Sequence, residues 1–419
     1  MRVTVDATPI RPGHAAGVEA FSYGLLTGLA ADRSCALRVD VLGGTLAEWH
    51  RNVPDLAGGR VVWTETAQPL RSDNPVGQLL RRWTPRRVRD SHAVRATINA
   101  VRQRAVPGQG DVDVTLYPFH AAPTRPGTSV VVLHDLRRLR ADSHAPGYAA
   151  VIRRNVARAS AVVVTWPHPY QEAVRMFPEA ADRIVLIPTP TFQPAPERAS
   201  ARPEPGLLLY PSSTAEHKNH ATLLEAMALL PQHRLICPGP LVEPEASRLL
   251  ARAARPDLRG RVAFPGFVSL DELNTLYARA DAVVVPSLWE AASGAMLEAF
   301  SWGLPVACAD VEPLLAQLEF TGAEATVFRA TDPASLAAAV RRLAADRAHY
   351  AAASRRANGR LATRTWAAVG RDYLDVLRWA AQGRPGPVPR CAFGAALNGD
   401  DLSGDDLSGA ALSPEQARG

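Results

Sequence analysis

Two glutamates in the second half of the chain have the types and spacing needed to bind a phosphorylated sugar. Glu290 follows the apolar run 282–285, and Glu298 comes eight residues later, after Ser293 and Gly294. Serine followed by glycine can begin a helix, whose first N–H groups are unpaired and carry a positive dipole. Phosphate oxygens bind at such a helix start, and nearby carboxylates accept hydrogen bonds from hydroxyls. The segment predicts a site for a ligand that combines a diphosphate with sugar hydroxyls.

Lys218 is the only lysine in the chain, where arginine supplies every other basic residue. It follows an apolar run at 207–210 and a polar loop, and it directly precedes a helical pattern at 221–230. A cation at the amino end of a helix is unfavourable unless it holds an anion there. The compact ammonium group suits a phosphate. We therefore expect Lys218 to hold an anion.

Two further candidates lie in the first half of the chain. His134 follows the apolar run 130–133, at the carboxyl end of a predicted strand, where open parallel sheets bind ligands. Gly17 lies between the first predicted strand and a helix, in a loop that does not match the dinucleotide-binding glycine pattern. A structural histidine and an ordinary strand-to-helix turn remain the alternatives for these two positions.

The elements that must position these residues are apolar runs that alternate with helical patterns. Continuous β-branched runs are typical of parallel strands buried on both faces, with helices between them. In the first half they lie at 3–5, 38–42, 61–64, 112–117, 130–133, 161–165 and 184–187. In the second half they lie at 207–210, 234–237, 261–264, 282–285 and 305–309.

This alternation predicts two α/β domains, at residues 1–187 and 207–382, with terminal helices in the second. The segment 188–206 contains six prolines and is predicted to be an extended linker. Helices dominate after residue 332, and we expect helix starts at Asp332 and at Thr363. The segment 383–419 is predicted to be a Pro/Gly linker followed by a tail.

Length and composition exclude several classes of protein. The 419 residues are 47% hydrophobic and 21% charged, which excludes a single small module, a disordered chain and a membrane-spanning bundle. Four widely spaced cysteines predict no zinc site and no disulfide framework. The amino terminus lacks signal-peptide features, so we expect a cytoplasmic protein. The net charge of +6 favours anionic partners in general.

The segment 282–306 resembles the acidic signature of the family-four retaining glycosyltransferases (glycosyltransferase group 1). Glu290 and Glu298 enclose seven residues and are followed by Ala-Phe-Ser-Trp-Gly-Leu-Pro-Val. The resemblance covers about residues 1 to 380 and is strongest in the second domain. It implies the GT-B fold, an α/β architecture of two Rossmann-like domains whose parallel sheets face each other across a cleft.

The resemblance also implies a retaining, metal-independent transfer of a sugar, with a nucleoside diphosphate sugar as co-substrate and no cofactor. The acceptor, a glycan, a lipid-linked molecule or a natural product, would bind mainly to the first domain. His134, Glu290 and Lys218 would be catalytic, with Glu290 contacting the donor sugar and Glu298 the ribose. The donor-binding residues would be Gly17, Ser213, Lys218, Glu290, Ser293, Gly294, Ala295 and Glu298.

Two departures from the family pattern bear on function. Ala291 and Ala292 stand where glycine is common, and Ser212, Ser213 and Thr214 occupy the region where an arginine commonly precedes the lysine. Either that arginine comes from elsewhere or the chain belongs to a branch that lacks it. Two alternative functions remain. The protein could be a non-catalytic protein that binds sugar nucleotides or mediates interactions, or it could be a GT-B sugar-nucleotide epimerase.

Two segments predict further partners. Eight arginines at 81–104 suit either a solvated helix or peripheral contact with an anionic membrane face, and we expect no nucleic acid partner. Leucines at 397, 402, 407 and 412 resemble pentapeptide repeats, which suits either a flexible acidic tail or a small cap that self-associates.

Asp111 and Asp113 open a predicted strand, and we expect no metal there.

Overall fold

The computed structural model describes residues 1–10, 12, 16–66, 112–120, 126–139, 146–191, 203–391 and 393. The arginine-rich segment 81–104, Asp111, most of the proline-rich linker and the four leucines of the tail lie outside these residues. The predictions made for them stay predictions.

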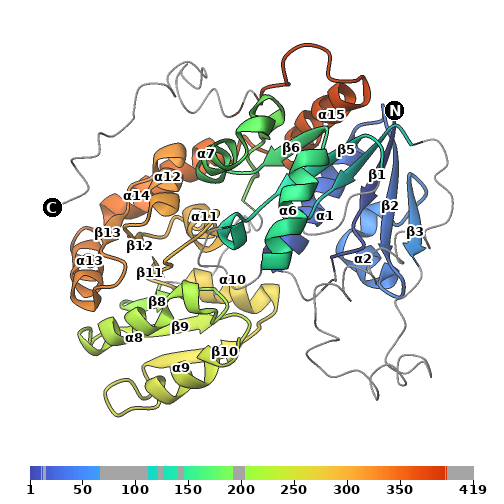
Figure 1. The fold of residues 1–419 in the computed structure, drawn as a ribbon. Helices are drawn as coiled ribbons and strands as arrows, with labels where there is room; N and C mark the ends of the chain where they lie inside the picture. The colour runs from blue at the N-terminus through green and yellow to red at the C-terminus, as the bar shows by residue number, and fades with distance from the viewer. Residues whose placement is uncertain are drawn as a thin grey trace, which may run out of the picture.

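The first domain is built on a parallel sheet that has seven strands in the described part of the chain (Figure 1). Its order is β3-β2-β1-β4-β5-β6-β7, which confirms the predicted parallel α/β class. The buried strands are short β-branched runs, as expected for strands covered on both faces. Their bounds are β1 Arg2–Asp6, β2 Ala36–Leu42, β3 Val61–Thr66, β4 Val114–Tyr117, β5 Ser129–Leu133, β6 Ala161–Val164 and β7 Ile184–Leu186.

Four α-helices of this domain connect or cover the strands in the described ranges. They are α1 Ala16–Ala31, α2 Leu46–Asn52, α6 Pro146–Arg158 and α7 Pro167–Met176. Short 3₁₀ helices lie at Pro54–Leu56 (η1), Arg137–Leu139 (η2) and Pro178–Arg183 (η3). None of the helices in the described residues is long and apolar enough to cross a membrane.

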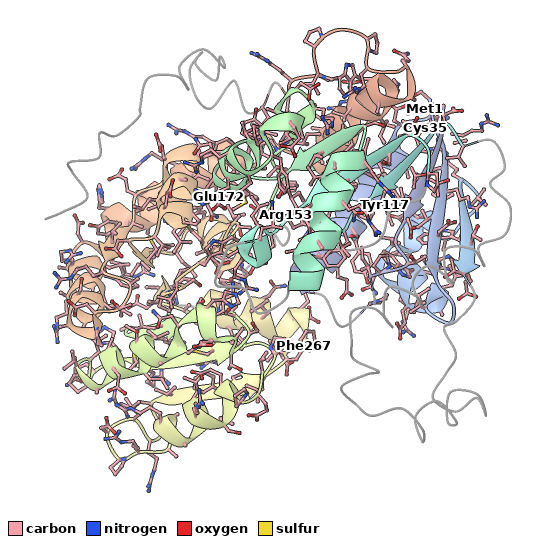
Figure 2. The ribbon with its side chains drawn as sticks, viewed as in Figure 1. Met1, Cys35, Tyr117, Arg153, Glu172 and Phe267 are labelled. Atoms are coloured by element: carbon pink, nitrogen blue, oxygen red, sulfur yellow. The ribbon has the colours of Figure 1, made fainter. Side chains whose placement is uncertain are left out.

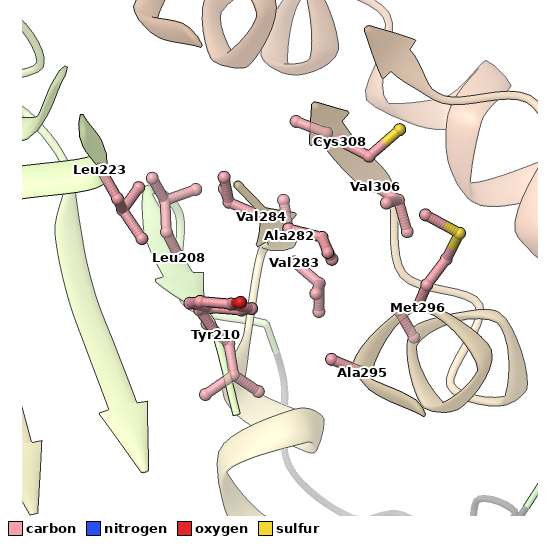
Figure 3. Packing of buried hydrophobic residues seen from close by; sticks show 14 of the residues in the cluster. Leu208, Tyr210, Leu223, Ala282, Val283, Val284, Ala295, Met296, Val306 and Cys308 are labelled. Carbon is pink, nitrogen blue, oxygen red and sulfur yellow. The ribbon is translucent and has the colours of Figure 1, made fainter. Parts of the chain in front are cut away.

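The second domain has a six-stranded parallel sheet of order β10-β9-β8-β11-β12-β13. Figure 3 shows how side chains of its central strands pack with helix α11 in the core. The strand β13 pairs with β12 and was not predicted, because Thr326, Val327 and Phe328 do not form a continuous run of apolar residues. The bounds are β8 Leu207–Leu209, β9 Arg234–Pro238, β10 Val262–Gly266, β11 Ala282–Val285, β12 Val306–Ala309 and β13 Thr326–Phe328.

Some helices of this half begin at recognisable side-chain caps. Ser269 forms a capping box with Glu272, and the Asp332 side chain accepts hydrogen bonds from the amides of Ala334 and Ser335, which confirms the helix start predicted there. The bounds are η4 Glu216–Lys218, α8 His220–Ala228, α9 Glu245–Ala253, α10 Leu270–Arg279, α11 Gly294–Ser301, α12 Glu312–Thr321, α13 Pro333–Ala345, α14 Arg347–Leu361 and α15 Trp366–Ala381.

The last helix, α15, follows the second domain in sequence but packs in the core of the first. Its apolar residues Val369, Tyr373 and Leu374 share a buried cluster with strands β1 and β2, and Figure 1 shows it beside the first domain. Helices α1 and α15 approach so closely that a Cβ on Gly370 would lie 2.2 Å from the backbone of Gly28. The predicted second domain, residues 207–382, includes this helix, whereas in the structure the helix packs with the first domain.

The crossing between the domains is fixed by a buried arginine. Arg364 donates from Nε to the carbonyl oxygen of Pro188 at 2.8 Å and pairs with Asp372 of α15 at 2.5 Å. The helix start predicted at Thr363 is wrong, because the Thr363 hydroxyl bonds the carbonyl of Arg360 and the Thr365 hydroxyl caps the helix. The two chain segments that join the domains therefore meet at Arg364.

We expect the Gly370→Ala substitution to lower the free energy of unfolding by about 1–3 kcal/mol, because the added methyl group overlaps the backbone of α1. Gly359 in α14 is the matched control, since a Cβ there meets nothing within 4 Å. Gly359→Ala should instead stabilise the chain by up to about 1 kcal/mol through helix propensity. Urea unfolding of both variants measures the difference, and equal effects would contradict the close approach of the two helices.

Candidate active site

An ion pair between Lys218 and Glu290 lies at the centre of the candidate site. The Lys218 ammonium donates to Oε1 of Glu290 at 2.6 Å, and the Ser287 hydroxyl donates to the same oxygen at 2.7 Å. Glu290 is only 7% exposed, so this carboxylate depends on partners that compensate its lost hydration. The buried Tyr210 hydroxyl lies 2.7 Å from the Ser287 hydroxyl and 3.2 Å from the carbonyl oxygen of Lys218. Because the Ser287 proton goes to Glu290, Tyr210 donates to Ser287.

The loop that carries Lys218 is locked to the neighbouring strand by Asn219. This residue adopts the left-handed conformation with φ of 56°, and its side-chain amide donates to the carbonyl oxygens of Pro286 and Ala330. The backbone N–H of Leu288 donates to the carbonyl oxygen of His217. Strands β8 and β11 are adjacent and parallel, so their loops meet at the same edge of the sheet.

Helix α11 begins beside this pair. Ser293 caps the helix by accepting from the amide of Met296, and its own amide donates to Oε1 of Gln317 at 2.7 Å. The amides of Gly294 and Ala295 follow, and the geometry of a helix leaves both without a partner inside it. A Cβ on Gly294 would meet nothing within 4 Å, so the backbone is open to a close approach there.

Glu298 lies one turn inside the same helix, in contact with the buried Tyr277. The Tyr277 hydroxyl donates to Oε2 of Glu298 at 2.6 Å, and its ring stacks on Trp302 at 5.9 Å between centroids. Burial raises the pKa of Glu298 to about 7, against the lowering effect of this hydrogen bond. The carboxyl group is therefore close to half-ionised at neutral pH.

His134 lies in the first domain, at the carboxyl end of β5. Its Nε2 lies 2.8 Å from the carbonyl oxygen of Pro118, so Nε2 carries the proton and Nδ1 is an acceptor. Burial lowers the pKa of His134 to about 4, which keeps the ring neutral. Phe21 contacts the ring edge-to-face at 4.6 Å and lies one turn after Gly17, where a Cβ would meet nothing within 4 Å.

The two domains come together at Arg137, three residues after His134. Its guanidinium carbon lies 5.8 Å from the ring centroid of Trp289, the residue before Glu290. The pKa of His217 falls to about 3, mainly through burial and then through the positive charge of Arg137. Burial also lowers the pKa of His220 to about 4.

The structure thus brings Lys218, Glu290 and the start of α11 together and places Glu298 on the same helix. Ser213 follows β8, in a loop whose path is fixed because a Cβ on Gly239 would overlap the Ser212 carbonyl oxygen at 2.2 Å. Ala292 packs against the core of the second domain. Asp113 accepts from the backbone N–H of Arg2 at 2.8 Å and pairs with the side chain of that residue.

Sequence reasoning missed the residues that support this site. Tyr277 and Gln317 contact it from helices other than α11, and Arg137 reaches it from the other domain, so no local spacing points to them. The sequence could have identified Ser287 as a site residue, because it lies three residues before Glu290 in the same loop. The sequence could also have identified Tyr210, because it ends the apolar run of β8 next to the lysine loop.

With this geometry established, residues 193–360 match the model of the family described as glycosyl transferases group 1. This stretch of the chain is therefore similar to glycosyl transferases group 1. The matched region includes Lys218, Glu290, Glu298 and all of helix α11.

The chain is also similar to a relative in sequence and to solved structures in fold. The chain is 31% identical over 160 residues to O-antigen chain mannosyltransferase B of Escherichia coli, a match that spans 34% of this chain and 41% of that enzyme. Sucrose-phosphate synthase from Thermosynechococcus elongatus superposes with a TM-score of 0.68 at 19% identity, covering 91% of this chain and 100% of the other. HepE of Anabaena with UDP and glucose gives 0.63 at 16% identity, covering 90% and 99%. The chain has the GT-B fold.

The raised pKa of Glu298 predicts how the free energy of unfolding depends on pH. A carboxyl group whose pKa is about 7 in the folded chain and about 4.5 in the unfolded chain stabilises the fold at low pH. That contribution is lost as the pH rises through 7. We expect wild type to lose about 3 kcal/mol more than Glu298→Gln between pH 4.5 and 8. Urea unfolding at both pH values measures this, and parallel pH profiles of the two proteins would contradict the assignment.

Proposed function

We propose that this protein transfers a sugar from a nucleoside diphosphate donor to a hydroxyl of an acceptor, with retention of the anomeric configuration. The carbon–oxygen bond between the anomeric carbon and the diphosphate breaks, and its electron pair leaves with the diphosphate. The acceptor oxygen forms the new bond to that carbon, and its proton leaves with the nucleoside diphosphate. The proposed reaction uses no metal and no cofactor.

The observation that carries the proposal is the convergence of Lys218, Glu290 and the start of α11 at one edge of the sheet. Lys218 and the amides of Gly294 and Ala295 would bind the diphosphate, using one ammonium group and the positive end of a helix. Glu290 would accept hydrogen bonds from the donor sugar and Glu298 from the ribose. Developing negative charge on the leaving group would meet donors already in place, which lowers the barrier.

His134 would bind the donor sugar from the first domain. Because Nε2 donates to the carbonyl oxygen of Pro118, the neutral ring offers Nδ1 as an acceptor for a sugar hydroxyl. A charged imidazolium would lack this acceptor, so the lowered pKa of His134 suits a binding role at neutral pH. Gly17 would let the start of α1 approach the diphosphate or the acceptor, because its surroundings are open.

The acceptor we propose is a glycan bound mainly by the first domain. The similarity to an O-antigen chain mannosyltransferase over 160 residues favours a glycan among the acceptors considered above. Contact with an anionic membrane face through residues 81–104 and self-association through the tail remain proposals of the same kind, each for a segment outside the described residues.

The test is donor turnover by single variants. We expect Glu290→Gln and Lys218→Ala to lower kcat about 10²–10³-fold, because each removes a charged group that acts on the reacting end of the donor. Glu324→Gln is the matched control, since Glu324 pairs with Arg356 and His349 on the surface of the same domain. Turnover of a nucleotide-sugar panel, followed by mass spectrometry with and without a glycan acceptor, measures the effect.

Full activity of both site variants would reject the assignment. Product that forms without an acceptor would favour an epimerase, and nucleotide-sugar binding without any turnover would favour a non-catalytic protein. The anomeric configuration of the product, read by NMR coupling constants, tests retention, and activity that persists in a chelator tests metal independence.

A further inference from the structure

The candidate site has little net positive charge of its own for the ligand proposed above. A nucleoside diphosphate carries roughly three negative charges at neutral pH when free. Lys218 is the only lysine of the chain, and its ammonium group already donates to the buried Glu290 carboxylate at 2.6 Å. The pair is close to neutral, so Lys218 compensates a carboxylate before it compensates any phosphate.

The histidines around this pair do not supply the missing charge. The pKa values of His217 and His220, which flank Lys218 and Asn219, lie at about 3 and 4. The pKa of His134 lies at about 4 as well. All three rings are neutral at pH 7, and the loop from Ser212 to Lys218 contains no arginine.

Arg137 is a cation that reaches this region from the first domain. Its guanidinium carbon lies 5.8 Å from the ring centroid of Trp289, the neighbour of Glu290. The positive charge of Arg137 also lowers the pKa of His217, the neighbour of Lys218, after the larger effect of burial. Its ion pair with Asp135 measures 3.7 Å, which is too long for a hydrogen bond between those two atoms.

We propose that Arg137 is the second cation of the donor site and contacts the diphosphate from the side of the first domain. This inference rests on the proposed function and names a binding residue for it. A planar guanidinium offers two parallel N–H groups to phosphate oxygens, which gives both charge and orientation. The cation that the lysine loop lacks comes from η2, immediately after the strand that ends at His134.

The position of Arg137 makes donor binding a property of both domains. Lys218 and α11 hold the diphosphate from the second domain, and Arg137 holds it from the first. A diphosphate bound between them would stabilise the arrangement in which both domains contact it. The ligand without its diphosphate would have no such effect.

The experiment is calorimetric titration of the full chain with UDP and GDP, and with the matching nucleoside monophosphates. We expect Arg137→Gln to weaken the diphosphate about ten- to a hundredfold and the monophosphate by much less, with Arg137→Lys in between. Arg153→Gln is the matched control, because Arg153 on α6, labelled in Figure 2, is exposed and its guanidinium carbon also lies near an aromatic ring, 5.9 Å from the ring centroid of Phe177. Thermal unfolding of each variant checks that it is folded.

Equal diphosphate affinity in wild type and Arg137→Gln would overturn the inference while leaving the proposed function intact. An equal loss for diphosphate and monophosphate would also overturn it, because it would show that Arg137 only positions the Trp289 loop. A wild-type chain that binds neither UDP nor GDP would overturn the proposed function itself.

Discussion

The ion pair between Lys218 and Glu290 joins two loops whose residues are 72 positions apart in the chain. Its geometry depends on the parallel pairing of β8 with β11, which brings the ends of both strands to one edge of the sheet. Ser287 and Tyr210 extend the pair into a chain of hydrogen bonds, and Asn219 ties the lysine loop to the end of β11. A buried charge pair is stable only when its remaining lone pairs and protons are also satisfied. The site is therefore organised before any ligand arrives.

This organisation also sets the electrostatic character of the site. A carboxylate that accepts from both an ammonium and a hydroxyl has little capacity left for ionic contacts, but its second oxygen can still accept from a neutral sugar hydroxyl. The other titratable residues of the candidate site are His134 and His217, which are neutral at pH 7, and Glu298, which is half-ionised. The candidate site thus combines strong hydrogen-bonding groups with a modest net charge.

Much of the fold could be predicted from the sequence, because continuous β-branched runs mark parallel strands directly. The side of the sheet on which the candidate residues meet could be predicted too, because Lys218 and Glu290 both follow such runs. The helix cap at Asp332 was recognisable, whereas the cap at Thr365 lay two residues beyond the expected Thr363. The difference arises because Arg364 between them is held by Pro188 and Asp372, a constraint set by distant residues.

Other parts of the site could not be predicted, since they depend on contacts between distant elements. Nothing near Gln317 in sequence indicates that its amide holds the backbone of Ser293 on both sides. The buried hydroxyl of Tyr277 has a partner only because α10 and α11 pack together. Arg137 is one arginine among many, and only the approach of the two domains distinguishes it.

The return of α15 to the first domain has a consequence for dissecting the protein. A recombinant fragment that stops near residue 190 would lack the helix that covers α1, and its apolar face would be left in water. A fragment that starts near residue 203 would carry α15 with nothing to pack against. Independent expression of either half therefore requires the terminal helix to be grafted onto the amino-terminal piece, because a single cut leaves both products incomplete.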